Sequence, residues 1–328
     1  MKYRYLGNTG IQVSSLCMGT MTFGREADAA ECRAMFNQCR EAGVNFFDCA
    51  NVYNKGQAEI ILGELISDCR DELIVTSKFG GPMGSGLNDR GASRRNLVSS
   101  LDASLKRLNT DYIDIYFLHH LDEYTPIEET LRALNDVVAQ GKVRCTGVSN
   151  FAAWQIAKAL GVAAHNGWTP FHCVQPMYNL VKRQAEVEIL PLAQSENLAV
   201  ISYNPLGGGL LTGKYGKNRQ AEQGRLTRDD MYQNRYADQW MYDAAVKFTQ
   251  FAADNGYHPV SLAVAWVAHH PAVTAPIMGA RNVEQLKDSL KAADIELSSG
   301  LYSEICRLTP TPPPATDRSE DRIKDQTP

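Results

Sequence analysis

The chain has 328 residues, of which 44% are hydrophobic and 21% are charged, and its formal net charge is −4. This composition is typical of a globular protein that forms one large α/β barrel or two smaller domains. No basic cluster is dense enough to predict nucleic-acid binding, and no apolar run approaches the roughly 18 residues needed to span a bilayer.

The chain begins with "MKYRYLGNTGIQVS", which predicts a hairpin that turns between Gly7 and Gly10 and closes one end of a barrel. This segment does not join a charged start to a long apolar stretch, so it does not predict a secretion signal. We therefore expect a cytoplasmic protein. Its eight cysteines form no CxxC pair and are expected to be reduced and mostly buried.

Short apolar runs then alternate with amphipathic stretches. The runs cover residues 15–21, 44–50, 73–79, 112–119, 143–150, 172–178, 198–205 and 273–280. Amphipathic patterns at 94–110, 126–141 and 282–294 predict helices, with Pro126 at one helix start and Gly141 at its end. Eight strands that are mostly followed by helices predict an α/β fold, a closed (β/α)₈ TIM barrel. A doubly wound sheet is the alternative, but its GxGxxG fingerprint is missing after the first strand.

Three segments fall outside this repeat. Residues 80–93 and 207–236 follow the third and seventh strands and are expected to be long loops, so that the C-terminal part of the barrel carries extra loops or helices. Residues 310–328 are proline-rich and charged, which predicts a solvated tail. No internal linker divides residues 1–309, and we expect them to form a single domain.

Chemically versatile residues occur where the predicted strands end. In a (β/α)₈ barrel these ends share one rim, where catalytic sites are found. Each residue alone has an ordinary structural explanation, but together they favour a functional site. In chain order they are Thr20, Met21, Asp48, Lys78, His119, Ser149, Asn150, Gln175, Tyr203 and Gly279.

Two further patterns do not support the sites that they suggest. The adjacent His119 and His120 are expected to point to opposite faces of a strand, so they should not share a metal ion. Residues 208–214 match GxxxxGK, but Tyr215 stands where a P-loop needs a serine or threonine to hold Mg²⁺. We expect no metal site, and we expect the glycines to approach a phosphate without nucleotide hydrolysis.

Several motifs together resemble the aldo-keto reductases, which are NAD(P)H-dependent barrel enzymes that interconvert carbonyls and alcohols. They are "FFDCANVY", "SKFG", "DYIDIYFLHH", "GVSN", "VQPMYN", "SYNPLGGGLLTGKY" and "PIMGARNVEQL", and the resemblance extends to about residue 309. It implies a catalytic tetrad of Asp48, Tyr53, Lys78 and His119. The substrate would be a small-molecule carbonyl or alcohol, and a homo-oligomer is possible.

The resemblance also implies a cofactor site. Around the nicotinamide it places Thr20, Ser149, Asn150, Gln175 and Tyr203. Along the pyrophosphate it places Asn204, Pro205, Leu206 and Lys214. Around the adenosine it places Gly279, Arg281, Gln285 and Asp288. The cofactor-binding set is completed by Met21, Asp48, Gly207, Gly208 and Ser289.

Hydride delivery to a carbonyl carbon leaves negative charge on the oxygen, which needs a nearby proton donor. Tyr53 would donate the proton, while the Lys78 ammonium lowers the pKa of its phenol and Asp48 keeps Lys78 charged. His119 would orient the carbonyl oxygen. Because Arg281 can pair with a 2′-phosphate, we expect NADPH as the cofactor, with NADH possible.

The substrate pocket is expected to be apolar and uncharged, with Met21, Phe23, Phe79, Met83, His120 and Phe151 on its loops. No cationic cluster in the sequence indicates an anionic substrate. An alternative function is a cofactor-binding partner, because potassium-channel β subunits also resemble this family. Those proteins tend to lack a histidine at the position of His119. A metal-dependent barrel hydrolase is a second alternative, but the strand ends lack its ligand set.

Overall fold

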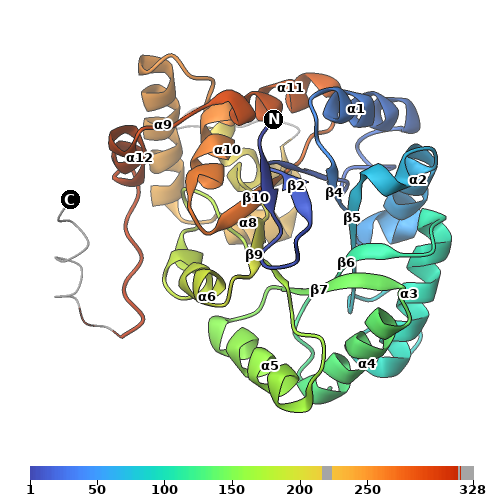
Figure 1. Ribbon diagram of the computed structural model, residues 1–328. Helices are drawn as coiled ribbons and strands as arrows, with labels where there is room; N and C mark the ends of the chain where they lie inside the picture. Colours follow the sequence, from blue (N-terminus) through green and yellow to red (C-terminus); the bar gives the residue numbers. More distant parts are fainter. Residues whose placement is uncertain (216–223, 317, 319–328) are drawn as a thin grey trace.

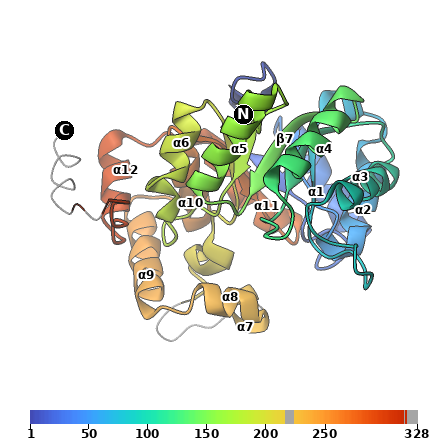
Figure 2. The same cartoon turned by 90° about the horizontal axis from the view of Figure 1, so that it is seen from below.

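The computed structural model describes residues 1–215, 224–316 and 318. The chain starts with an antiparallel hairpin of β1 (Tyr3–Tyr5) and β2 (Gln12–Ser14). Leu6 and Val13 of this hairpin pack with barrel residues such as Phe46 and Ile115, all of them buried. The hairpin therefore closes one end of the barrel, as the sequence predicts (Figure 2).

Eight parallel strands form a closed barrel, in which β10 pairs with β3. They are β3 (Cys17–Gly19), β4 (Phe46–Asp48), β5 (Ile74–Phe79), β6 (Ile113–Leu118), β7 (Val143–Ser149), β8 (Cys173–Gln175), β9 (Ala199–Ser202) and β10 (Val273–Met278). Each strand lies inside one of the eight predicted apolar runs, so the (β/α)₈ fold is confirmed (Figure 1). Neighbouring residues in a strand point their side chains to opposite faces of the sheet. Ile115 and Phe117 therefore pack inside the barrel, whereas Tyr116 and Leu118 pack under the helices.

Helices surround the strands. They are α1 (Ala29–Glu41), α2 (Gln57–Ile66), α3 (Arg94–Leu108), α4 (Ile127–Ala139), α5 (Ala153–Asn166), α6 (Ile189–Ser195), α10 (Pro259–His269) and α11 (Val283–Leu290). The Ser93 side chain caps α3 by accepting from Asn96 N, and Asn109 ends the helix in a left-handed conformation. Pro126 precedes α4 and Gly141, with φ of 75°, follows it, as predicted. The barrel layers thus match their sequence signals closely.

The long insertion after β9 contains short helices, in agreement with the expectation of extra loops or helices in the C-terminal part of the barrel. Residues 207–236 include η4 (Gly207–Thr212), α7 (Arg225–Arg228) and α8 (Asp230–Arg235), with 216–223 outside the described residues. The Asp229 side chain starts α8 by accepting from the backbone N–H groups of Met231 and Tyr232. Figure 2 shows α7 and α8 beyond the end of the barrel that lies opposite the hairpin.

Two further helices are α9 (Gln239–Asp254), which precedes α10, and α12 (Ser299–Cys306), the last helix, with η5 (Lys291–Asp294) between α11 and α12. The domain boundary at residue 309 and the tail at 310–328 stay predictions, and residues 317 and 319–328 of that tail lie outside the described part. All eight cysteines are free thiols and six of them are buried. Among the described residues, no helix has both the length and the apolar character that a membrane crossing requires.

Candidate active site

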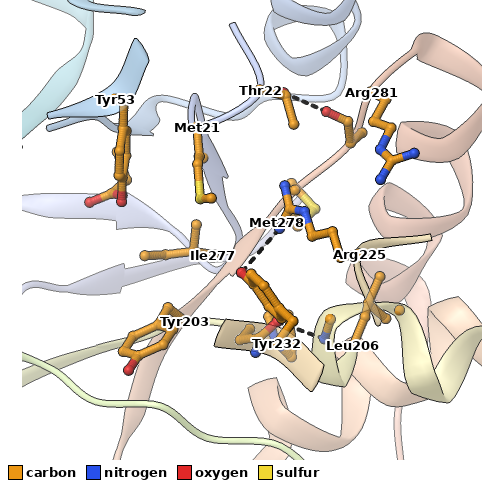
Figure 3. A pocket seen from close by; sticks show the side chains of 18 of the residues that line it. Met21, Thr22, Tyr53, Tyr203, Leu206, Arg225, Tyr232, Ile277, Met278 and Arg281 are labelled. Carbon is orange, nitrogen blue, oxygen red and sulfur yellow. Dashed lines mark hydrogen bonds between the residues drawn. The ribbon is translucent and has the colours of Figure 1, made fainter. Parts of the chain in front are cut away.

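The carboxyl ends of the barrel strands border a cavity of about 700 Å³. Tyr53 and His119 line one end of it, and Arg281, Gln285 and Asp288 line the other. In Figure 3, Tyr53 and Met21 lie on one side of the cavity, and Arg281 lies on the opposite side. The cavity is therefore long enough to join the predicted catalytic residues to the predicted adenosine site.

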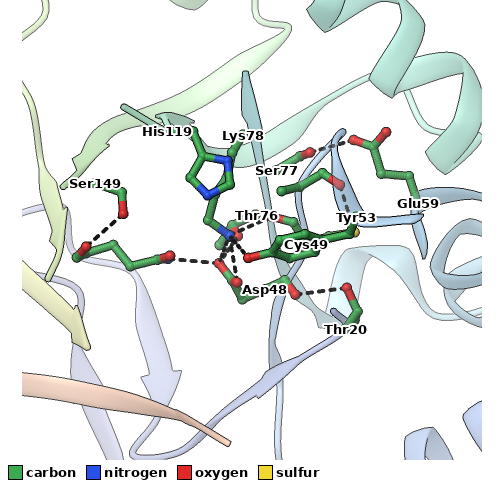
Figure 4. Close-up of polar contacts among 12 residues, drawn as sticks. Thr20, Asp48, Cys49, Tyr53, Glu59, Thr76, Ser77, Lys78, His119 and Ser149 are labelled. Carbon is green, nitrogen blue, oxygen red and sulfur yellow. Dashed lines mark hydrogen bonds and ion pairs between the residues drawn. The ribbon is translucent and has the colours of Figure 1, made fainter. Parts of the chain in front are cut away.

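A buried acid–amine pair lies behind the catalytic end of the cavity (Figure 4). Lys78 is 0% exposed, and its Nζ lies 2.7 Å and 2.6 Å from the two carboxylate oxygens of Asp48 and 2.7 Å from the Cys49 carbonyl oxygen. Asp48 also accepts from Thr76 Oγ1 at 2.7 Å and from Gln175 Nε2 at 2.9 Å. Buried charges are tolerated when they are paired and hydrogen-bonded, and this pair meets both conditions.

Tyr53 follows β4 on a short loop that holds its phenol over the amine. Lys78 Nζ donates to the Tyr53 hydroxyl at 3.5 Å, a long hydrogen bond. The next residues, Asn54 and Lys55, have φ of 46° and 54°, which is unusual for residues other than glycine. Asn54 Nδ2 donates to the Gly24 carbonyl oxygen at 2.5 Å, which helps to fix this turn. The chain after Tyr53 is thus held in a strained conformation that orients the phenol.

His119 lies one residue beyond β6. Its ring is edge-on to Tyr53, with 6.1 Å between centroids and 79° between planes, and its buried Nδ1 has no hydrogen-bond partner in the part of the chain described. The His120 ring stacks on it at 4.7 Å and 10°. The expectation that these two rings point to opposite faces was wrong, because the strand ends at Leu118 and its alternation does not extend to them.

The protonation states of the catalytic end follow from burial and charge. Burial raises the pKa of Tyr53 to about 12, although the Lys78 ammonium lowers it. Burial lowers the pKa of Lys78, but Asp48 and then Tyr53 raise it, and the pKa ends above its usual value. Burial, with Lys78 and His120, holds the pKa of His119 well below its usual range. At neutral pH the site therefore contains an ammonium, a protonated phenol and a neutral imidazole.

The direction of the Tyr53 pKa corrects the sequence-based expectation. That expectation considered only the ammonium of Lys78, which does act in the predicted direction. The loss of water around the half-buried phenol disfavours the phenolate by more than the neighbouring charge favours it. The protonated phenol is nevertheless the form that can donate a proton.

Most of the predicted cofactor-binding residues line the cavity. They are Met21, Asp48, Ser149, Asn150, Gln175, Tyr203, Asn204, Pro205, Leu206, Gly208, Lys214, Gly279, Arg281, Gln285 and Asp288. The structure does not place Thr20, Gly207 or Ser289 on the cavity wall. These three are buried beside it, and the Thr20 hydroxyl donates to the Asp48 carbonyl oxygen at 3.0 Å.

The residues predicted around the nicotinamide are connected to the catalytic end. Tyr203 donates from its hydroxyl to Asn150 Oδ1 at 2.7 Å, and Asn150 Nδ2 donates to the His119 carbonyl oxygen at 2.9 Å. Ser149 Oγ donates to the Gln175 carbonyl oxygen at 2.8 Å. These contacts connect the ends of four successive strands, β6 to β9.

The glycine-rich segment after β9 forms a turn that is anchored from two sides. Asn204, with φ of 67°, accepts at Oδ1 from the Gly208 backbone N–H at 2.8 Å. Its Nδ2 donates to the Tyr236 hydroxyl at 2.7 Å, and Asn179 Nδ2 donates to the same hydroxyl at 3.1 Å. Gly208 has φ of 68°, a conformation that favours glycine. The turn therefore brings backbone to the cavity where a side chain would obstruct it.

Sequence reasoning missed the residues that α7 and α8 bring to the cavity. Arg225, Met231, Tyr232 and Arg235 all line it. The Arg225 guanidinium donates to the Tyr232 hydroxyl at 3.3 Å. These residues lie more than twenty positions beyond β9, so no strand end indicated them, and only Asp229, a helix-capping residue, signalled ordered structure there. Other missed lining residues include Thr22, Val52, Ile277 and Met278.

The predicted substrate pocket is only partly correct. Met21 and His120 line the cavity, but Phe23, Phe79 and Phe151 are buried in the core under the helices. Phe79 is the strand neighbour of Lys78, so its side chain points away from the barrel interior and stacks on Tyr116. Met83 is half-buried and does not line the cavity. The described residues contain no group of three His, Cys, Asp or Glu side chains able to hold a metal ion.

Comparison with known proteins identifies one family over most of the chain. The profile of the Aldo/keto reductase family matches residues 15–309. The uncharacterised oxidoreductase YrpG of Bacillus subtilis is 36% identical over 323 residues, which cover 95% of this chain and 97% of that protein. A probable voltage-gated potassium channel subunit beta of rice, Oryza sativa subsp. japonica, is 38% identical over 90% of this chain and 92% of its own length. The L-glyceraldehyde 3-phosphate reductase of Escherichia coli is 33% identical over 89% of this chain and 87% of its own length.

Proposed function

Because the chain belongs to the aldo/keto reductase family and is an oxidoreductase, we propose that it reduces an aldehyde or ketone with NADPH. The reverse reaction would oxidise an alcohol or lactol, and Tyr53 would serve as the general acid and base. The observation that carries this proposal is the Tyr53 phenol, held 3.5 Å from the buried Lys78 ammonium at the end of the cavity.

The cavity fits a nicotinamide dinucleotide, which would supply the hydride when bound. Tyr203 offers a flat face at the catalytic end, and the turn at Asn204–Gly208 lines the cavity together with Lys214, whose ammonium would face the pyrophosphate. At Gly279 a Cβ atom would meet nothing within 4 Å, so this part of the wall is open for a ligand. Arg281 and Gln285 would hold the adenosine end.

Each catalytic side chain has a separate task. Tyr53 would give its phenolic proton to the carbonyl oxygen of the substrate. Lys78 would stabilise the phenolate that this transfer leaves, and Asp48 would keep Lys78 charged and in position. His119, neutral and with an unpartnered Nδ1 among the described residues, would orient the carbonyl oxygen.

A cluster of cations supports NADPH rather than NADH. Lys214, Arg225 and Arg281 all line the cavity, and burial, then Arg281 and Arg225, lower the pKa of Lys214, so three positive charges lie near one another on its wall. A 2′-phosphate would reduce their mutual repulsion. We expect kcat/KM to be higher with NADPH, and equal or better use of NADH would reverse this choice.

Substitution of Tyr53 by phenylalanine tests the general acid, because it removes only the hydroxyl group. Tyr53→Phe is expected to keep NADPH affinity, measured by fluorescence titration, and to lose about 1,000-fold in carbonyl reduction. Tyr124→Phe is the matched control, because Tyr124 is 96% exposed and lies outside the cavity. Turnover near that of the unmodified protein in Tyr53→Phe would remove the assignment.

A second candidate function is a cofactor-binding partner subunit, and the 38% identity to the rice channel subunit favours considering it. The presence of His119 beside Tyr53 favours an enzyme instead. NADPH oxidation with a panel of aldehydes and ketones discriminates between the two. Tight NADPH binding with no turnover of any carbonyl would support the partner subunit.

A further inference from the structure

Thr76 is a residue of β5 that belongs neither to the cavity wall nor to the predicted tetrad. It is 0% exposed and does not line the cavity. It pairs in register with Asp48 of β4, and its carbonyl oxygen accepts from the Cys49 N–H at 3.1 Å. The β-branched side chain of a threonine has few χ1 rotamers in a strand, so the direction of its hydroxyl is restricted. This hydroxyl lies beside the buried acid–amine pair (Figure 4).

Strand alternation places Thr76 and Lys78 on the same face of β5. Residues two apart in a strand share a face, and the residue between them points to the other face. Thr76 Oγ1 donates to Asp48 Oδ1 at 2.7 Å, and Lys78 Nζ donates to the same oxygen at 2.7 Å. Ser77 instead donates to Glu59 of α2 at 2.5 Å, on the helix side of the sheet. One strand thus supplies Asp48 with both a counter-charge and a neutral donor.

A third donor to Asp48 Oδ1 is Gln175 Nε2, at 2.9 Å. Gln175 lines the cavity, so a ligand bound there can compete for its amide group. Thr76 is shielded from the cavity, so such a ligand does not reach its hydroxyl. Thr76 is therefore the neutral donor that holds this carboxylate oxygen whether or not the cavity is occupied.

The position of the Asp48 carboxylate determines where the Lys78 ammonium lies. Both carboxylate oxygens contact Lys78 Nζ, at 2.7 Å and 2.6 Å. The same ammonium donates to the Tyr53 hydroxyl at 3.5 Å, so a rotation of the carboxylate would change a hydrogen bond that is already long. Electrostatic stabilisation of a developing charge requires donors that are held in place before the reaction, and small displacements reduce it.

We propose that Thr76 is a positioning residue that acts through Asp48. Its hydroxyl fixes the carboxylate, which in turn holds the Lys78 ammonium where the phenolate of Tyr53 forms. This inference rests on the proposed carbonyl reduction. A purely structural hydroxyl, which only satisfies a buried polar group, would affect stability and leave the turnover of the folded protein unchanged.

Thr76→Val tests the proposal, because it removes the hydroxyl and keeps the β-branched shape. With the carbonyl of the panel that the unmodified protein reduces fastest, kcat is expected to fall about tenfold, since a hydrogen bond to a charged group is lost. The KM for that carbonyl and the Kd for NADPH should stay within about twofold, because Thr76 does not reach the cavity. Thr76→Ser returns a hydroxyl and should restore kcat to within about threefold. A kcat within about twofold in Thr76→Val, or no recovery in Thr76→Ser, would overturn the inference.

Two further variants separate positioning from stability. Ser77→Ala removes the neighbouring buried hydroxyl on the helix side of β5, and it should lower the urea midpoint without changing kcat. In the Asp48→Asn background, Thr76→Val should cause no further loss of kcat, because the carboxylate that Thr76 holds is already absent. An equal loss of kcat in Ser77→Ala, or an additive loss in the double variant, would also overturn the inference. If Thr76→Val does not fold, Thr76→Ala lacks the same hydroxyl and carries the same expectations.

The failure of the inference is distinguishable from failure of the proposed function. If the unmodified protein reduces carbonyls and Thr76→Val reduces them equally well, only the role of Thr76 is wrong. If the unmodified protein oxidises NADPH with no carbonyl of the panel, the proposed function is wrong, and the role of Thr76 is wrong with it.

Discussion

Replacement of Asp48 by asparagine tests whether the buried acid–amine pair supports both stability and catalysis. Asparagine keeps the shape of the side chain and an oxygen that can accept from Thr76 and Gln175, as Asp48 Oδ1 does at 2.7 Å and 2.9 Å. The other oxygen, which lies 2.6 Å from Lys78 Nζ, is replaced by an NH₂ group, and the side chain loses its negative charge. The substitution therefore leaves the ammonium of Lys78 without a counter-charge.

The magnitude follows from the burial of the pair. Lys78 is 0% exposed and Asp48 is 2% exposed, so water cannot replace the missing carboxylate. Breaking a buried pair by removing one partner costs about 3–5 kcal/mol of unfolding free energy, and we expect a loss in that range for Asp48→Asn. Reduction activity should fall as well, because without Asp48 burial favours the neutral form of Lys78, which cannot stabilise the phenolate of Tyr53.

The double variant Asp48→Asn with Lys78→Met distinguishes the two roles. It removes both charges, and replacing a buried ion pair by uncharged groups is often nearly neutral for stability. Equilibrium unfolding in urea should show that the double variant recovers much of the lost free energy, while NADPH oxidation stays low. A loss of less than about 1 kcal/mol in Asp48→Asn, or recovery of activity in the double variant, would refute this reasoning.

Two further predictions follow from individual residues. Burial raises the pKa of Tyr53 to about 12, above the value near 10 of an unfolded tyrosine, so the stability from this phenol is complete below pH 10 and is lost as the pH rises toward 12. The pH profile of kcat/KM for reduction should accordingly show no inflection from Tyr53 between pH 7 and 10, and an inflection there would contradict the raised pKa. Gly63→Ala should destabilise the protein by about 1–3 kcal/mol in urea unfolding, since a Cβ would lie 2.6 Å from the Leu108 carbonyl oxygen. Gly161→Ala, where nothing lies within 4 Å, should instead stabilise α5 by about 0.5–1 kcal/mol, and equal effects at the two sites would show that close packing is not the cause.

The barrel and the place of its catalytic residues could be predicted because they depend on local patterns and on one topological rule. Strand alternation sets which side chains face the interior, and parallel closure brings all carboxyl ends to one rim. Asp48 and Lys78 could be expected to meet because they lie on adjacent strands near that rim. Tyr53 lies beyond the strand end, and it was identified because the motif that contains it, "FFDCANVY", resembles the aldo-keto reductases.

Other features depend on tertiary contacts that no local pattern encodes. The stacking of His119 and His120 depends on where β6 ends, and the pKa of Tyr53 depends on a balance between burial and a neighbouring charge. How deeply a side chain is buried depends on contacts with residues distant in the chain, so its position in the sequence does not reveal it.

The sequence by itself determined a closed parallel barrel and the rim on which Asp48, Lys78 and His119 converge, because the period of a strand and the closure of the sheet leave little freedom there. Only the tertiary structure decided that α7 and α8 bring Arg225, Tyr232 and Arg235 to the cavity, because the docking of an insertion depends on packing against residues distant in the chain.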